Sequence, residues 1–252
     1  MPNRTEGRKD DTRSSQRSFW AGGAVALAVV AFVSSGAQHI RLAEAAQAES
    51  KPPEPNAELG AVIAAQGTAS GGPACAGCHA FDGASDGTGA FPRITGLPVD
   101  YIEAQLRDFA SGVRQNAIMS PIAKALSPAE INNVAAYYAN VKAPFPPLKS
   151  ASPALIKLGE QIATAGDADK GIPGCEACHG PNGNGQLGIA PYLGGQYAHY
   201  IAFTLHMWRR GYRKNSGEVM EPFAKKLDDQ QIEAVAAYFQ QVSASATATT
   251  QK

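Results

Sequence analysis

The chain has 252 residues, and its 22 Lys and Arg balance its 22 Asp and Glu, so the formal net charge is zero. Residues 46–147 carry 6 basic and 9 acidic side chains and residues 148–252 carry 10 and 9, so neither half is basic enough to indicate a nucleic-acid-binding protein. Only four cysteines are present, and all of them fall in two short motifs.

The N-terminus predicts export from the cytoplasm. Residues 1–18 carry five Lys or Arg against three Asp or Glu, residues 19–33 are uncharged and mostly apolar, and small residues follow. This succession predicts a secretory signal peptide within residues 1–45. An uncleaved membrane anchor is the alternative, because the 19 uncharged residues of 19–37 are just long enough to span a bilayer. Both alternatives place the rest of the chain in the periplasm, either soluble or tethered to the inner membrane, with residues 46–57 as a flexible spacer.

Residues 75–79 read CAGCH and place two Cys and one His within about one helical turn. A zinc site commonly adds a second Cys pair or a His pair nearby, but the next Cys after Cys78 is Cys175, and the next His after His79 is His179. A thioredoxin-like redox pair belongs near a βαβ pattern, and the flanking residues show no strand signal. Covalent haem attachment is the third interpretation, and it uses every residue of the motif.

Two Cys three residues apart lie on one side of a helical turn, so the thiols of Cys75 and Cys78 can both bond to one porphyrin edge. The neighbouring His79 then binds the iron from one face. Met as the sixth ligand raises the potential of an electron carrier, and Met119 lies 40 residues after His79 in the pattern Met-x-Pro-x-Ala-Lys-x-Leu. A role as a core residue is the alternative for Met119.

The first domain is expected to span residues 58–143 and to end in a helix. Ser127, Pro128 and Glu130 supply an N-cap, a proline at the first helical position and an acidic residue in the first turn. Residues 144–154 contain four Pro and are expected to form a stiff, extended linker.

The second domain is expected to span residues 155–243, and residues 244–252 are expected to be a disordered tail. Its motif reads CEACH, and a Met follows the motif His at 41 residues, in the same pattern as in the first domain. Met207, His199 and His206 have no equivalent ligand in the first domain and are expected to be packing or surface residues. The residues expected to hold the second haem are Cys175, Cys178, His179 and Met220.

Similarity between the two halves extends beyond these ligands. LGAVIAAQG at 59–67 matches LGEQIATAG at 158–166, and INNVAAYYANV at 131–141 matches IEAVAAYFQQV at 232–242. Each half reads as a helix, a motif helix, a Gly-rich loop, a helix, a Met loop and a final helix, and no run alternates long enough to predict a strand. The sequence therefore predicts an all-α fold of two tandem domains, each wrapped around one covalently attached haem.

With these paired motifs, the chain resembles the class I di-haem cytochromes c, and most closely the cytochrome c4 family, over residues 56–243. The resemblance implies two all-α class I cytochrome c domains with their haems close together near the domain interface. It also implies that Gly60 and Gly159 lie where the first helix of each domain crosses the last, against Tyr137 and Tyr238. The Gly-rich loop of the first half departs from the family, because it lacks the HGPNG form of the second half.

These features predict a periplasmic carrier of single electrons, which takes them from a quinol-oxidising donor and passes them to a terminal oxidase or reductase. No catalytic residue is expected, because both irons would be filled on both faces. The alternatives are a haem-containing subunit of a membrane-bound oxidoreductase and a di-haem peroxidase, which would need one iron with an open position.

Overall fold

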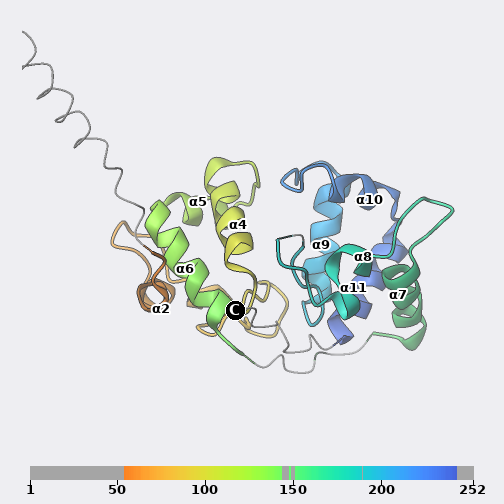
Figure 1. The fold of residues 1–252 in the computed structure, drawn as a ribbon, viewed down its shortest axis with the longest axis horizontal. Helices are drawn as coiled ribbons and strands as arrows, with labels where there is room; N and C mark the ends of the chain where they lie inside the picture. The colour runs from red at the N-terminus through yellow and green to blue at the C-terminus, as the bar shows by residue number, and fades with distance from the viewer. Residues whose placement is uncertain (1–53, 144–147, 149–150, 189, 243–252) are drawn as a thin grey trace, which may run out of the picture. The chain divides into compact units, whose positions relative to one another are not determined.

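The computed structural model describes residues 54–143, 148, 151–188 and 190–242 (Figure 1). The expected signal peptide or anchor, most of the spacer, the centre of the linker and the C-terminal tail lie outside the described residues. All the described residues belong to one compact unit, Pro52–Lys252.

The described residues are helical and contain no strand, which confirms the all-α prediction. The helices of the first half are α2 (Ala57–Gln66), α3 (Ala76–His79), α4 (Val99–Ser111), α5 (Met119–Lys124) and α6 (Pro128–Asn140). Those of the second half are α7 (Pro153–Ala165), α8 (Glu176–His179), the 3-10 helix η1 (Pro181–Gly183), α9 (Ala198–Arg209), α10 (Met220–Lys226) and α11 (Asp229–Gln241). Within the described part of the chain, every helix is too short or too polar to span a bilayer.

The Met-x-Pro stretches were expected to be loops, but each forms a short helix that begins at its methionine. The Asn116 Oδ1 accepts from the Met119 N–H at 2.8 Å, and the Ser216 Oγ accepts from the Met220 N–H at 3.2 Å. These side chains satisfy N–H groups that have no partner inside the helix, so α5 and α10 can start there.

Capping side chains fix where the last helix of each half begins. The Ser127 Oγ accepts from the Glu130 N–H at 3.3 Å, and the Glu130 carboxylate accepts from the Ser127 N–H at 2.7 Å. Asp228 and Gln231 form the same reciprocal pair at the start of α11. The predicted N-cap at Ser127 is therefore confirmed, and the last helix of each half begins with a capping box.

Two further caps move domain edges by a few residues. The Ser152 Oγ accepts from the Leu155 N–H at 3.3 Å and Pro153 is the first residue of α7, so the last proline of the expected linker belongs to a helix. Asn56 caps α2, which begins at Ala57, so the end of the expected spacer already belongs to the first domain.

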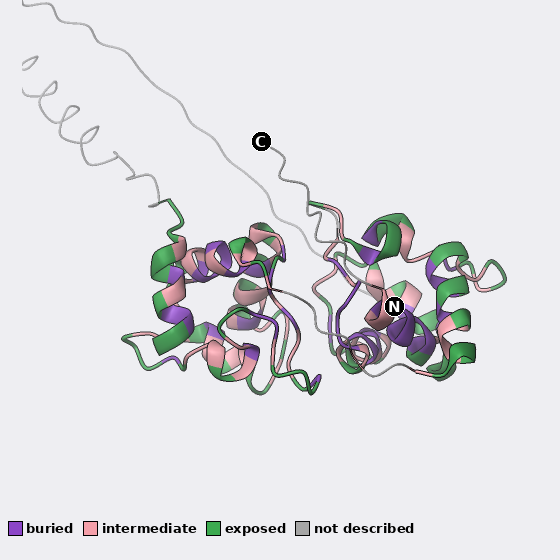
Figure 2. Cartoon of the chain, turned by 90° about the horizontal axis from the view of Figure 1, so that it is seen from below, coloured by how far each residue is buried: buried purple, intermediate pink, exposed green. Residues whose placement is uncertain are grey.

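The first helix of each half crosses the last helix at a glycine. A Cβ added at Gly60 or Gly159 would lie 2.0 Å from a backbone carbonyl oxygen of the facing helix, and 2.8 Å from the Cβ of Tyr137 or Tyr238. Only glycine permits this approach, which confirms the crossing that the family resemblance implies. Each helix buries one side and exposes the other (Figure 2).

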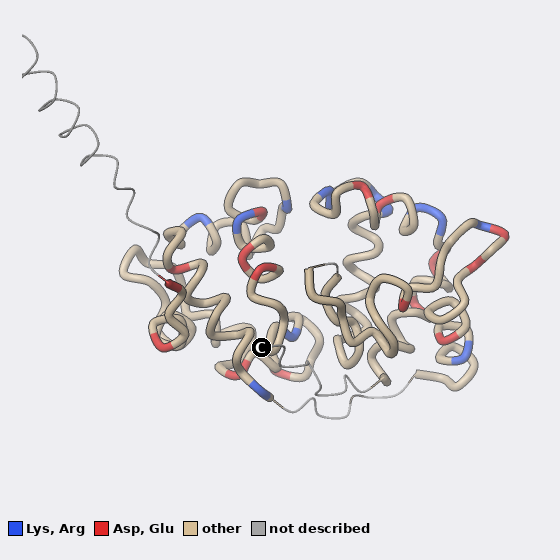
Figure 3. The backbone as a smooth tube through the Cα atoms, in the orientation of Figure 1, with Lys and Arg blue, Asp and Glu red and all other residues tan. Residues whose placement is uncertain are grey.

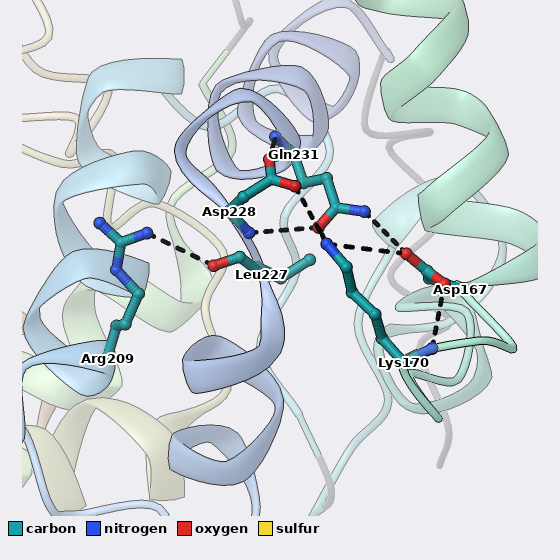
Figure 4. Close-up of polar contacts among 6 residues, drawn as sticks. All are labelled: Asp167, Lys170, Arg209, Leu227, Asp228 and Gln231. Carbon is teal, nitrogen blue, oxygen red and sulfur yellow. Dashed lines mark hydrogen bonds and ion pairs between the residues drawn. The ribbon is translucent and has the colours of Figure 1, made fainter.

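In the second half, a charged network ties the loop before the CEACH motif to the start of α11 (Figure 4). The Lys170 Nζ donates to the Asp228 Oδ2 at 3.0 Å and to the Gln231 Oε1 at 2.7 Å. The Gln231 Nε2 donates in turn to the Asp167 Oδ2 at 2.8 Å. The first half makes the equivalent tie with neutral groups, since the Ser70 Oγ donates to the Ala125 carbonyl at 2.8 Å.

Hydrogen bonds also join the two halves. The Arg93 N–H donates to the Gln196 Oε1 at 3.0 Å, and the Gln196 Nε2 donates back to the Arg93 carbonyl at 2.9 Å. The Arg93 Nη1 donates to the Gly195 carbonyl at 2.5 Å, and the Tyr192 hydroxyl donates to the Thr95 carbonyl at 3.1 Å. Because Arg93 and Gln196 are buried, these bonds satisfy polar groups that would otherwise be costly to remove from water.

Candidate haem sites

The two motif histidines are held in the same way. His79 and His179 are buried, the His79 Nδ1 lies 2.9 Å from the Pro92 carbonyl, and the His179 Nδ1 lies 2.8 Å from the Pro191 carbonyl. A carbonyl can only accept, so Nδ1 carries the proton and the lone pair of Nε2 is left for a metal. Burial also lowers the pKa of both imidazoles, which keeps them in the neutral form that binds iron.

The four cysteines are unpaired and sit at the start and on the short helices of the motifs. Burial raises the pKa of the Cys75 thiol and raises that of Cys175 to about 11. Such thiols lack the depressed pKa of a thioredoxin-like redox pair. In the described residues, no three His, Cys, Asp or Glu side chains are grouped as a zinc site requires. Haem attachment is the interpretation that these side chains fit.

Met119 and Met220 occupy matched positions. Each is half-buried and is the first residue of a short helix, α5 or α10, that packs on the preceding long helix, α4 or α9. Met207 lies instead within α9, where it lines a cavity of about 20 Å³. His199 is exposed, and the His206 Nδ1 lies 3.1 Å from the Arg209 Nη2. The assignment of the two helix-starting methionines as iron ligands stays a prediction.

The carbonyls that orient the histidines are functional groups that our sequence analysis did not single out. Pro92 and Pro191 follow the motif His by 13 and 12 residues, in stretches that align between the halves. The repeated proline at matched spacing was the available signal. Proline fits this position because it has no N–H to satisfy, while its carbonyl remains free to accept.

Each half of the chain matches a family of haem proteins. Residues 57–142 match the family described as Cytochrome c, and residues 171–239 match the family described as Cytochrome C oxidase, cbb3-type, subunit III. The cytochrome c4 of Stutzerimonas stutzeri is 36% identical over 178 residues, which are 66% of this chain and 83% of that protein. The crystal structure of reduced recombinant cytochrome c4 from Pseudomonas stutzeri matches with a TM-score of 0.66 and 34% identity, over 75% of this chain and 99% of that one.

The chain belongs to the cytochrome c4 family. A further relative of this cytochrome is named "Thiosulfate dehydrogenase electron acceptor" and comes from Stutzerimonas stutzeri strain A1501. It is 41% identical over 175 residues, which are 69% of this chain and 81% of the relative.

The two cytochrome c domains carry two covalently bound haem c groups, attached through Cys75, Cys78, Cys175 and Cys178, with His79 and His179 as the motif histidines. Each domain has a buried imidazole with Nε2 available and two unpaired thiols one helical turn apart. These groups fit one haem c in each domain. The protein is thus a di-haem electron carrier of the cytochrome c4 type.

Proposed function

We propose that this cytochrome carries single electrons in the periplasm, from a quinol-oxidising complex to a terminal oxidase or reductase. Bound haem supplies reversible one-electron chemistry at its iron. The carrying observation is the equivalence of the two sites: each has a buried His with Nε2 available and a Met at the start of a short helix. With Met119 and Met220 as sixth ligands, neither iron has an open position for a substrate.

This equivalence speaks against the peroxidase alternative, which requires one iron that differs from the other. The subunit alternative requires stable attachment to a membrane complex, through residues 19–37, which lie outside the described residues. The carrier hypothesis and the subunit hypothesis both assume that the chain is exported from the cytoplasm. Intact mass of the periplasmic protein checks it: loss of the first 35 to 45 residues supports a signal peptide, and a full-length, membrane-retained protein supports the anchor.

The name of the 41%-identical relative favours a second donor, namely a thiosulfate dehydrogenase. Such an enzyme would deliver its electrons one at a time, and two haems on one chain could store the pair released by a two-electron oxidation. The two donors can be told apart by the rate at which each reduces the cytochrome.

The test mixes the oxidised holoprotein with a reduced quinol-oxidising complex, and separately with a thiosulfate dehydrogenase and thiosulfate, and follows haem reduction by stopped-flow absorbance. Fast reduction by one donor, followed by fast oxidation by a terminal oxidase, supports the carrier function and selects the donor. Slow exchange with every partner, together with hydrogen peroxide turnover, would show that the protein is an enzyme.

A further inference from the structure

The methionine expected to bind the haem of the second domain lies on a helix that is too short to be stable by itself. Helix α10 has seven residues, Met220–Lys226, and isolated helices shorter than about 12 residues are marginal in water. Ala224 of this helix and the following Leu227 are buried in the core of the second domain. Burial of apolar groups is non-directional, so the polar contacts at the end of α10 help to fix its tilt.

Cationic side chains tie the end of α10 to two other elements. The Arg209 Nη1, at the end of α9, donates to the Leu227 carbonyl at 3.3 Å, and the Arg209 Nη2 pairs with the Asp229 carboxylate. The Lys226 Nζ donates to the Gly171 carbonyl at 3.1 Å. The turn between α10 and α11 is thus bound both to α9 and to the loop that precedes the CEACH motif.

Lys170, in the same loop, reaches across to this turn (Figure 4). Its Nζ donates to the Asp228 Oδ2 at 3.0 Å and to the Gln231 Oε1 at 2.7 Å. Gln231 belongs to the capping box of α11 and donates from Nε2 to the Asp167 Oδ2 at 2.8 Å. These side chains form one connected network, and a network of several charges contributes more than an isolated surface ion pair.

The loop that carries Lys170 leads directly into the haem attachment motif. Asp167 and Ile172 exchange two backbone hydrogen bonds of 2.9 Å, which close the loop. Ile172 belongs to the core cluster against which both Met220 and Cys175 pack. The loop therefore couples the position of the attachment motif to the position of the helix that carries Met220.

The first half has a neutral contact at the matching place. Its loop is one residue shorter, at 67–75 against 166–175, and it contains no charged residue. The Ser70 Oγ donates to the Ala125 carbonyl, just after α5, at 2.8 Å. The end of α5 is thus held by a neutral hydrogen bond where charged side chains hold the end of α10.

We propose that Lys170 and Arg209 are positioning residues for the methionine ligand of the second haem. By holding the end of α10, they keep the Met220 thioether at the iron. The inference rests on the proposed ligation of that iron by Met220. An iron bound by His and Met accepts an external base only after the Met leaves, so the affinity for imidazole measures how readily Met220 departs.

The experiment titrates the oxidised holoprotein with imidazole, while haem methyl NMR signals report each haem separately. Lys170→Met removes the ammonium group and keeps most of the length of the side chain. Because the Lys170 and Asp228 side chains are 36% and 57% exposed, solvent screening limits the effect. We expect the imidazole affinity of the second haem to rise about fivefold, with the first haem unchanged. Arg209→Gln should act in the same direction.

The equivalent variant in the first half is Ser70→Ala, which should raise the imidazole affinity of the first haem alone, by about twofold. Lys157→Met is the matched control, because Lys157 is an exposed lysine of α7, and it should leave both affinities unchanged. Lys170→Arg keeps a cationic donor and should restore most of the wild-type affinity. Added salt should raise the affinity of the second haem in the wild type but not in Lys170→Met, since screening weakens the same contacts.

Unchanged imidazole affinity of the second haem in both Lys170→Met and Arg209→Gln would overturn the proposal. Equal rises at both haems in Lys170→Met would also overturn it, because they would indicate a loss of overall stability. The salt titration of the wild type tests the same contacts if a variant fails to fold. A second haem that stays low-spin in Met220→Ala without imidazole would instead overturn the proposed ligation, so the two failures are read from different variants.

Discussion

The backbone around the two CxxCH motifs makes the same hydrogen bonds in both halves, whereas the side chains that brace it differ. The His79 N–H donates to the Cys75 carbonyl at 3.0 Å, and the His179 N–H donates to the Cys175 carbonyl at 2.9 Å. By contrast, the tyrosine at the helix crossing donates to a backbone carbonyl in the first half and to the Glu176 carboxylate in the second. The charged network in Figure 4 has only hydroxyl counterparts in the first half.

The shared backbone geometry lies next to the haem attachment site, whereas the side chains that differ between the halves lie further from it. The motif turn, the histidine tautomer and the helix crossing are the same in both halves, and the tautomer is the one that leaves Nε2 free for the haem iron. The bracing side chains lie further out and need only hold the loop, so neutral and charged solutions are both possible. Sites that share ligands can therefore differ in stability and potential, and each prediction below compares matched positions in the two halves.

The largest expected effect is loss of a proposed sixth ligand. Met119→Ala and Met220→Ala should each make about half of the haem high-spin and able to bind carbon monoxide. Each variant should also lower the reduction potential of the haem that lost its ligand by roughly a few hundred millivolts. Visible spectra and redox titration measure this. Met207→Ala is the control, and high-spin haem in that variant would reassign the ligand to α9.

Replacing the glycine at the helix crossing should destabilise both halves equally. Gly60→Ala or Gly159→Ala would push a Cβ to 2.0 Å from a carbonyl oxygen, so the helices must separate. We expect destabilisation of roughly 3 kcal/mol or more, measured by chemical denaturation of the holoprotein. The neighbouring exposed variants Leu59→Ala and Glu160→Ala should change stability by less than about 0.5 kcal/mol. A mild effect in only one half would show that its crossing can relax.

The residue after each motif histidine should behave oppositely in the two halves. Ala80 has φ 61° and ψ 160°, a conformation that Gly180 adopts at φ 75° and ψ 163° and that is strained for any residue with a Cβ. Ala80→Gly should therefore stabilise the first half by about 1 kcal/mol, and Gly180→Ala should destabilise the second by about 1–3 kcal/mol. Thermal unfolding measures both, and destabilisation by Ala80→Gly would contradict the strain.

The sequence predicted the parts of the molecule that rest on repeated, local signals. Helix types, the cap at Ser127 and the two attachment motifs follow from short local patterns, whereas the glycine crossing was implied by the family resemblance. The contacts of Arg93 with Gln196, and of Gln105 with Arg213, join residues about one hundred positions apart in the sequence. Arg93, Gln196 and Gln105 have no residue of the same type at the matching position of the other half. Comparison of the halves therefore could not reveal them.

The smallest expected effect concerns the order of the two potentials. Our sequence comparison counts a net charge of +1 in residues 107–115 and +4 in residues 206–214. Oxidised haem carries one more positive charge than reduced haem, so nearby positive charge favours the reduced form. The haem of the second domain (haem two) should therefore have a higher potential than the haem of the first domain (haem one). The structure reduces this excess, because Arg209 pairs with Asp229 and Arg213 is buried. Basic and acidic positions are interspersed along the described chain (Figure 3).

Arg210 and Lys214 remain as exposed cations beyond ion-pair distance of any carboxylate in the described residues. Solvent screening leaves each worth only a few tenths of a kcal/mol, and 1 kcal/mol corresponds to about 40 mV for one electron. We therefore expect haem two to lie about 20–40 mV above haem one, so that electrons settle in the second domain. Redox titration of Met119→His and Met220→His assigns the waves, since each variant should lower one. Arg210→Gln combined with Lys214→Gln should then remove most of the gap, and displacement of the lower wave by Met220→His would show that haem exposure outweighs surface charge.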